Sequence, residues 1–193
     1  SHTRPLGKKS GIRAFINFTN LDAFRLLNSK GLPDLKASSG FDAAVQFVHQ
    51  FDDNTAFQLF YLGFNERFRF ETKTPYYTGD FEQQKPRHLA IINWQLDRSD
   101  WSWTLNQSVD WENAEYRLGN SLTAPRRLPG HLAAHGTYSK PGFQLLTGGT
   151  WNVYADRVKG QFPLTDHGLR PEDPTGFFTQ STDHQLAEAY AYT

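Results

Sequence analysis

Residues 101–111, WSWTLNQSVDW, alternate between bulky apolar and small polar side chains. Trp101, Trp103 and Leu105 belong to one set, and Ser102 and Thr104 belong to the other. Because successive side chains of an extended strand point to opposite faces of a sheet, the pattern predicts a strand with one apolar and one polar face. The apolar face must then be covered either by the core of a soluble protein or by lipid, and this choice decides the fold.

Short and long connections alternate strictly along the chain. Three short segments rich in Asp, Asn, Ser, Gly or Pro predict tight hairpins: FDDNT (51–55), DRSDW (97–101) and SKPGF (139–143). Long polar links with several prolines lie between them, at about 71–87, 118–130 and 157–176. Since consecutive antiparallel strands reverse direction, every short turn lies at one end and every long loop at the other. Outer-membrane barrels have this layout, with periplasmic turns and extracellular loops.

The sequence therefore predicts an all-β chain, 15% aromatic, with about eight strands. The strands are expected at about 11–19, 43–51, 55–70, 88–97, 101–117, 131–139, 142–156 and 177–192. Residues 1–10 are predicted to be a flexible polar leader, and residues 1–193 a single β-barrel region. The favoured fold is an antiparallel up-and-down transmembrane β-barrel or a segment of one. A soluble β-sandwich, whose polar face is simply wet, is the alternative.

Strand length and tryptophan placement favour the barrel. The ten residue steps from Trp101 to Trp111 cover roughly 25 Å at about 3.3 Å per residue and a tilt near 40°, which is the height of a barrel's apolar band. Tryptophans are predicted to be membrane-interface aromatics at five positions: Trp94, Trp101, Trp103, Trp111 and Trp151. Strand 55–70 departs from the pattern, because both of its faces carry aromatic residues.

Composition excludes several classes of protein. The chain has no cysteine, so disulfides, thiol catalysis and thiolate metal sites are excluded. Lys plus Arg equals Asp plus Glu at 20 each, so bulk charge does not point to nucleic acid. No apolar run approaches the roughly 20 residues that a membrane-spanning helix needs. Methionine is absent, even at position 1, and we expect a processed or excised product from which any signal peptide is gone.

One long stretch resembles a known family. Residues 31–64, GLPDLKASSGFDAAVQFVHQFDDNTAFQLFYLGF, resemble a recurrent segment of TonB-dependent outer-membrane receptors. In those receptors a G-N-P-D-L-K-P-E-like loop leads into a strand, an F-D-D-N-like turn and an aromatic strand. The loop is matched by Pro33, Asp34, Leu35 and Lys36, although Ala37 and Ser38 replace its usual Pro-Glu, and the turn is matched by Phe51, Asp52, Asp53 and Asn54.

The resemblance continues in order to about residue 157. HLAIINWQLDRSDWSWTLNQSVDWENAEY and RRLPGHLAAHGTYSKPGFQLLTGGTWNVYADR look like later hairpins of the same barrels. The family implies a barrel of about 22 strands closed by a plug and driven by TonB to import siderophores, cobalamin, haem or sugars. This chain has no room for a plug, shows no candidate TonB box and ends LAEAYAYT rather than on Phe. We therefore expect a segment of a larger receptor, whose remaining barrel and plug lie elsewhere, on the same or on another chain.

The sequence gives little support for a catalytic site or a metal site. His131 and His135 are four residues apart, but on a strand they lie about 13 Å apart, too far to share one ion. Asp110 and Glu112 lie two apart on one strand face, where solvated polarity is far more common than a glycosidase pair. We find no nucleophile elbow, phosphate-binding glycine loop or zinc spacing. The expectation is therefore no enzyme, no metal and no cofactor; a barrel-embedded enzyme acting on lipid is a third, less favoured alternative.

Two of the predicted loops offer the better binding candidates. Aromatic and cationic groups at a barrel mouth can capture an anionic or aromatic solute by stacking and paired hydrogen bonds. The candidate ligand-binding residues are Tyr76, Tyr77, Phe81, Arg87, Arg126 and Arg127. Ordinary loop packing, or contact of the arginines with lipopolysaccharide, is the alternative role. The predicted function is uptake of a small solute, such as a siderophore-like metal chelate, across the bacterial outer membrane, with its lipid as a partner. A soluble carbohydrate-binding sandwich is the alternative.

Overall fold

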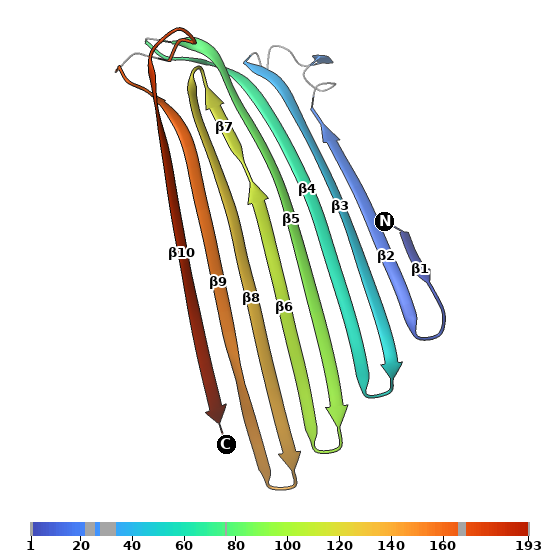
Figure 1. Cartoon of the computed structure of the whole chain (residues 1–193). Coiled ribbons are helices and arrows are strands. Elements are labelled where there is room, and N and C mark those ends of the chain that lie inside the picture. Colours follow the sequence, from blue (N-terminus) through green and yellow to red (C-terminus); the bar gives the residue numbers. More distant parts are fainter. Residues whose placement is uncertain (1, 22–25, 28–33, 76, 166–168, 193) are drawn as a thin grey trace.

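The computed structural model describes the whole chain except residues 1, 22–25, 28–33, 76, 166–168 and 193. The described residues form one antiparallel sheet of ten strands, which bends along its length (Figure 1). Neighbouring strands follow the order β1-β2-β3-β4-β5-β6-β8-β9-β10, and the short β7 pairs with β5 and β8. The prediction of an all-β antiparallel meander is confirmed.

The bounds of the strands are β1 His2–Pro5, β2 Ser10–Asn20, β3 Leu35–Asp52, β4 Thr55–Lys73, β5 Thr78–Arg98, β6 Trp101–Asn113, β7 Glu115–Leu118, β8 Ser121–Lys140, β9 Phe143–Pro163 and β10 Thr175–Tyr192.

Tight turns join the strands at one end of the sheet (Figure 1). The three predicted hairpins are confirmed, between β3 and β4, between β5 and β6, and between β8 and β9. Ser99 and Gly142 lie in two of these turns with φ of 47° and 79°, the left-handed region that a two-residue hairpin requires. The remaining connections of the main meander lie at the opposite end, as the alternation of connection lengths predicts.

Much of the predicted loop sequence is strand, so the prediction of three long loops was wrong in extent. β4 and β5 are joined only by residues 74–77, and β8 and β9 continue to 121 and 163. The sheet accommodates the prolines that suggested loops. β6 ends beside Pro125, whose carbonyl accepts a 2.9 Å hydrogen bond from Ala114 N. The pairing of β6 with β8 is interrupted beside Pro129. Residues 2–5, expected in a flexible leader, form β1 and pair with β2.

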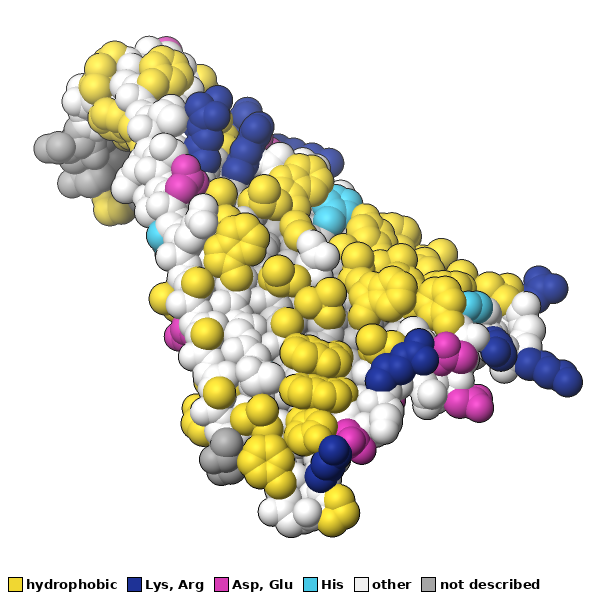
Figure 2. Space-filling view, turned by 60° about the horizontal axis from the view of Figure 1, so that its bottom comes forward, with side chains coloured by type: hydrophobic (Ala, Val, Ile, Leu, Met, Phe, Trp, Pro, Cys, Tyr) yellow, Lys and Arg dark blue, Asp and Glu magenta, His cyan; other side chains and the backbone are white. Residues whose placement is uncertain are grey.

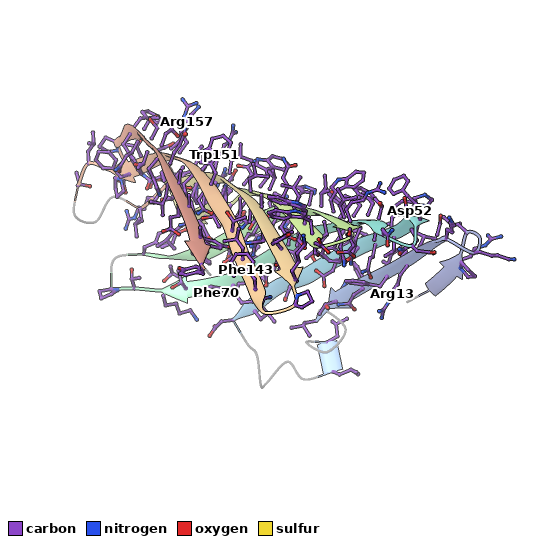
Figure 3. All side chains as sticks on the ribbon, turned by 90° about the horizontal axis from the view of Figure 1, so that it is seen from below. Arg13, Asp52, Phe70, Phe143, Trp151 and Arg157 are labelled. Carbon is purple, nitrogen blue, oxygen red and sulfur yellow. The ribbon has the colours of Figure 1, made fainter. Side chains whose placement is uncertain are left out.

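The register defines two faces across the whole sheet. We call the face of Trp103, Leu105 and Val109 in β6 the apolar face, and the face of Thr104 and Ser108 the polar face. Directly opposed residues on neighbouring strands share a face, so the register assigns every strand. Figure 3 shows Trp151 and Arg157 on the apolar side of the ribbon and Arg13 and Phe70 on the other side.

In the described part of the chain, no protein core covers either face of the sheet. Among the described residues, the buried hydrophobic set is only Leu35, Ala44, Ala114 and Ala133. Ala44 and Ala133, which are 2% and 3% exposed, both lie on the polar face. Large side chains on the apolar face stay open, as the hydrophobic band in Figure 2 shows. A single layer of this kind leaves its hydrophobic surface to be covered by something outside these strands.

The exposure of β6 is the inverse of that of a soluble protein. From Trp103 to Trp111 every apolar-face residue is exposed, and every polar-face residue between them is half-buried. Ser, Thr, Asn and Asp are therefore less accessible than Trp, Leu and Val. This difference is expected when the polar side chains crowd on the inner side of a curved sheet and the apolar ones spread on its outer side.

The strands are tilted relative to the line of short turns. One row of directly opposed residues crosses the sheet through Asn17, Asp42, Phe64, Arg87, Glu112, Arg127, Asp156 and Thr182. The number of residues between this row and the short turn of each hairpin increases across the sheet, from the turn at Asp53 to those at Ser99 and Pro141. The increase is about one residue per strand. One residue of about 3.3 Å for each strand spacing of about 4.8 Å corresponds to a tilt near 35°.

Candidate functional site

Negatively and positively charged side chains alternate along the cross-strand row on the polar face. Asp42, Arg87, Glu112, Arg127 and Asp156 follow one another from β3 to β9, with only Phe64 of β4 between the first two. Arg87 Nε donates a 2.9 Å hydrogen bond to Asp110 Oδ1, and a second guanidinium nitrogen bonds the other oxygen of that carboxylate. Lys85 Nζ lies 3.3 Å from Glu112 Oε2. The polar face thus carries a band of fixed, mostly compensated charge.

A depression opens on the polar face at one side of this band. Its volume is about 440 Å³, within the range of small-molecule sites. The residues that line it come from β2 to β5: Phe15, Asp42, Leu62, Phe64, Arg87 and Leu89. Apolar walls with one cation and one anion suit a solute that has both an apolar body and a charged group. This depression is the candidate solute site.

Asp42 has unused hydrogen-bonding capacity in this depression. Its Oδ2 accepts a 3.1 Å hydrogen bond from Asn17 Nδ2. Its Oδ1 is buried, and within the described part of the chain it has no hydrogen-bond partner. A buried carboxylate oxygen without a donor is costly, so a donor group of a bound solute or a water molecule would be stabilised there.

The six predicted ligand-binding residues do not form one cluster. Tyr76 lies outside the described residues, and Tyr77 closes the β4–β5 turn through a 2.7 Å bond from Thr74 N to its carbonyl. Phe81 packs against Phe70 on the polar face, with ring centroids 5.0 Å apart. Placing Phe81, Arg87, Arg126 and Arg127 in loops was wrong: the first two lie in β5 and the other two in β8.

Arg126 and Arg127 are neighbours in sequence and point to opposite faces. Arg127 opposes Glu112 and Asp156 in the polar row, whereas Arg126 opposes Arg157 on the apolar face. Arg87 alone of the predicted set lines the candidate solute site. The other lining residues were missed by the sequence-based prediction. The signal that pointed to them was the departure of strand 55–70 from alternation, since Leu62 and Phe64 lie on the otherwise polar face.

The five predicted interface tryptophans do share the apolar face. Trp101 and Trp103 lie near the short turns and stack with ring centroids 5.7 Å apart, and Trp111 lies toward the opposite end of β6. Trp94 and Trp151 lie between these levels. Four of the five are 40–46% exposed in spite of their size, so this face presents its largest hydrophobic groups to the surroundings.

Histidines of the polar face are engaged in pairwise contacts. His131 Nδ1 lies 2.6 Å from Asn152 Oδ1, and His135 hydrogen-bonds Tyr190 on β10. In the part of the chain that the structure describes, no three His, Cys, Asp or Glu side chains gather in a way that could hold a metal ion. His131 thus connects β8 to its neighbour β9, and His135 reaches across β9 to β10.

Ion pairs join β3, β4 and β5 beyond the apolar band, near the β4–β5 connection. Arg69 Nε lies 2.7 Å from Asp80 Oδ2 and 3.1 Å from Glu82 Oε1, and Lys36 bonds Asp80 and lies 3.5 Å from Glu71. The ammonium group of Lys36, and then Arg69, lower the pKa of Asp80 below its usual 3.8, although partial desolvation opposes them. Asp80 therefore carries a negative charge throughout the neutral range.

Replacing Asp80 with Asn is expected to loosen this end of the β4–β5 hairpin in a pH-dependent way. Because the folded state lowers the pKa of Asp80, its contribution is full above the unfolded pKa and disappears as pH falls through the folded one. Amides flanking residues 74–77 should exchange faster in Asp80→Asn than in the unmodified chain at pH 7, and the difference should shrink as the pH falls below the ordinary carboxyl pKa of 3.8. Asp53→Asn, in an exposed short turn, is the control; a pH-independent difference would contradict the role of the charge.

Comparisons with known proteins give no family assignment: no protein-family model matches the chain, and neither does any curated protein. Among the described residues, no helix is both long enough and apolar enough to cross a membrane.

Proposed function

We propose that this chain forms part of the wall of a transmembrane β-barrel in a bacterial outer membrane. The observation that carries the proposal is the inverted exposure of β6, where Trp103, Leu105 and Val109 are open and Thr104 and Ser108 are half-buried. In a soluble protein, burial of apolar side chains drives folding, so the reverse pattern would be costly in water. In a bilayer the same pattern places hydrocarbon against the apolar face and water against the polar one.

Three further features support a membrane barrel. The tilt near 35° that follows from the register falls at the lower end of the range for outer-membrane barrels. Tight turns gather at one end of the sheet and the other connections at the opposite end. Strands of 18 to 21 residues in β3, β4, β5, β8, β9 and β10 exceed the 9–11 or so that a bilayer requires, so they would extend past the membrane into solvent.

The more specific proposal is a receptor of TonB-dependent type that takes up a small solute. Its support is the resemblance of residues 31–64 and the later hairpins to that family, together with the depression on the polar face. In this scheme a solute on the inner side contacts Phe64, and its charged groups meet Arg87 and Asp42. Energy for transport, a plug and contact with TonB would come from outside these strands.

Labels on adjacent residues of β6 test the membrane assignment. Single cysteines at Val109 and Ser108 can carry nitroxide labels, since the chain has no cysteine of its own. In the complete protein reconstituted in lipid vesicles, dissolved oxygen should relax the label at Val109→Cys, and a water-soluble nickel complex should relax the label at Ser108→Cys. Oxygen concentrates in hydrocarbon and the nickel complex stays in water, so the two labels should respond oppositely.

The same pair distinguishes the soluble alternative. In a carbohydrate-binding sandwich, the apolar face would pack on a second sheet, and the label at Val109 would be inaccessible to both agents. That result, or a protein that stays in the soluble fraction after cell lysis, would refute the barrel. A label at Ser108 that responds to oxygen alone would also contradict it.

A further inference from the structure

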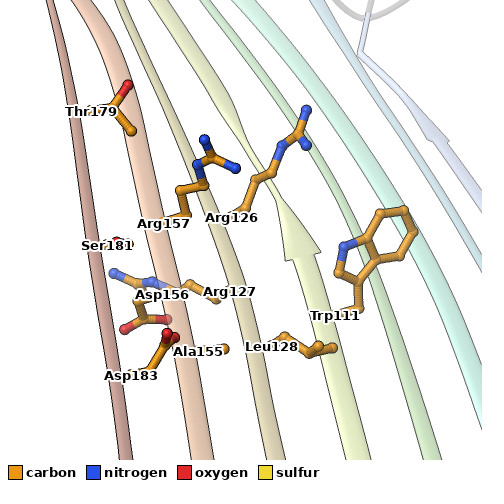
Figure 4. A pocket seen from close by; sticks show the side chains of 10 residues that line it. All are labelled: Trp111, Arg126, Arg127, Leu128, Ala155, Asp156, Arg157, Thr179, Ser181 and Asp183. Atoms are coloured by element: carbon orange, nitrogen blue, oxygen red, sulfur yellow. The ribbon is translucent and has the colours of Figure 1, made fainter.

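Two arginines oppose each other directly on the apolar face. Arg126 of β8 and Arg157 of β9 are cross-strand partners, and in Figure 4 their side chains lie next to each other and point toward the long-connection end. Like charges in directly opposed positions destabilise a sheet. Within the described residues, no carboxylate lies within ion-pair distance of either guanidinium, whereas Arg69 has two such partners and Arg87 has Asp110. We call Arg126 and Arg157 the arginine pair.

The arginine pair borders a shallow depression of about 410 Å³. Trp111, Leu128 and Ala155 supply its apolar side, and Ser181 and Asp183 of β10 supply polar groups. Asp183 is the one carboxylate among the lining residues on this face, because Asp156 belongs to the polar row. Figure 4 shows both guanidinium groups pointing away from Asp183, so it does not neutralise them.

The position of the pair at the margin of the hydrophobic band indicates its ligand. Arg126 and Arg157 each lie two residues beyond an apolar-face partner, Leu128 and Ala155, and Figure 2 shows cationic side chains gathered where the hydrophobic surface ends. If the apolar face lies against lipid, as proposed above, this level is the membrane interface. Phosphates of lipid headgroups lie there, and guanidinium groups bind phosphate through paired, charge-assisted hydrogen bonds.

We infer that the arginine pair binds the phosphate of an anionic membrane lipid, whose acyl chains lie along Trp111 and Leu128. The bound phosphate offsets the repulsion between the two guanidinium groups. The apolar groups below exclude water and hold the chains. This inference rests on the proposed membrane location and adds a lipid-specific site to it.

The test uses the complete protein in vesicles of a zwitterionic phospholipid, with or without an anionic phospholipid. The variant is Arg126→Gln/Arg157→Gln, and the matched control is Arg127→Gln, the next residue on the opposite face. Anionic lipid should raise the thermal unfolding temperature of the unmodified protein and the control, and it should leave the double variant unchanged. Retention of anionic lipid after detergent extraction should fall by about tenfold in the double variant alone.

Further measurements in the same experiment separate the possible explanations. Without anionic lipid, the double variant should be at least as stable as the unmodified protein, because like-charge repulsion is removed. Arg126→Lys/Arg157→Lys should retain part of the lipid response. Stabilisation by millimolar inorganic phosphate, or by an acidic peptide, equal to that by anionic lipid would overturn the lipid assignment. A protein that floats with vesicles but shows no anionic-lipid response refutes this site alone, whereas a protein that fails to float refutes the proposed function as well.

Discussion

Replacing Leu105 with arginine is expected to lower the free energy of unfolding in lipid by about 2–4 kcal/mol. That magnitude is typical of a cation placed on the lipid-facing side of a barrel near the bilayer midplane. Leu105 is 40% exposed on the apolar face and lies between Trp103 and Trp111, away from both ends of the hydrophobic band. Unfolding titrations with guanidinium chloride in lipid vesicles measure the effect directly.

The matched control is Thr104→Arg, one residue earlier on the same strand. Thr104 lies on the polar face among Gln95 and Asn106, beside a depression of about 350 Å³ that offers room for the longer side chain. Its cost should stay below about 1 kcal/mol, because a water-lined surface solvates the charge. If Thr104→Arg were the more damaging variant, or if Leu105→Arg were tolerated, the apolar face would not lie against hydrocarbon.

The alternation of side chains made the two faces predictable from sequence. Within β6, every residue from Trp101 to Trp111 except Gln107 has the polarity of the face on which it lies, and Ser99 and Gly142 lie in the short turns with left-handed backbone. Local signals of these two kinds are sufficient for an antiparallel meander, because each strand pairs with its neighbour in the chain.

The extent of the strands was not predictable in the same way. Residues 78–87 continue β5 beyond the apolar band, where most side chains on both faces are polar. Period-two alternation of hydrophobicity vanishes there, because neither face meets an apolar environment. Pro86, Pro125 and Pro129 then suggest a loop, although the sheet tolerates them.

The candidate solute site depends on register, which no single strand specifies. Phe15, Asp42, Phe64 and Arg87 meet only because four strands align two adjacent cross-strand rows, and between these rows and the β3–β4 turn the register shifts at Gln50 and Asp52. A slip of one residue in any strand would move its side chain to the opposite face. For the same reason, sequence grouped Arg126 with Arg127, although the sheet separates them.

The amides of β10 are expected to exchange as slowly as those of β9 in the complete, membrane-embedded protein. β10 pairs with β9 along its whole length, and among the described residues no strand pairs with its other edge. Backbone groups left unpaired at the level of the hydrocarbon are too costly to persist, so a membrane barrel must supply a strand on that side. The partner would come from further barrel strands outside those described.

Hydrogen exchange measured by mass spectrometry tests whether the free edge of β10 is paired in the complete protein. Peptides from β4 and β5, paired on both sides within the structure, provide the internal reference for full protection. In a closed barrel, the Thr175–Tyr192 peptide should match them, with exchange slowed by about two or more orders of magnitude relative to an unpaired chain. If instead half of the β10 amides exchanged at once while β9 stayed protected, this edge would be open to water. A lipid-facing sheet with an open edge is not physically tenable, so that outcome would exclude the membrane barrel even if the apolar face proved to be covered.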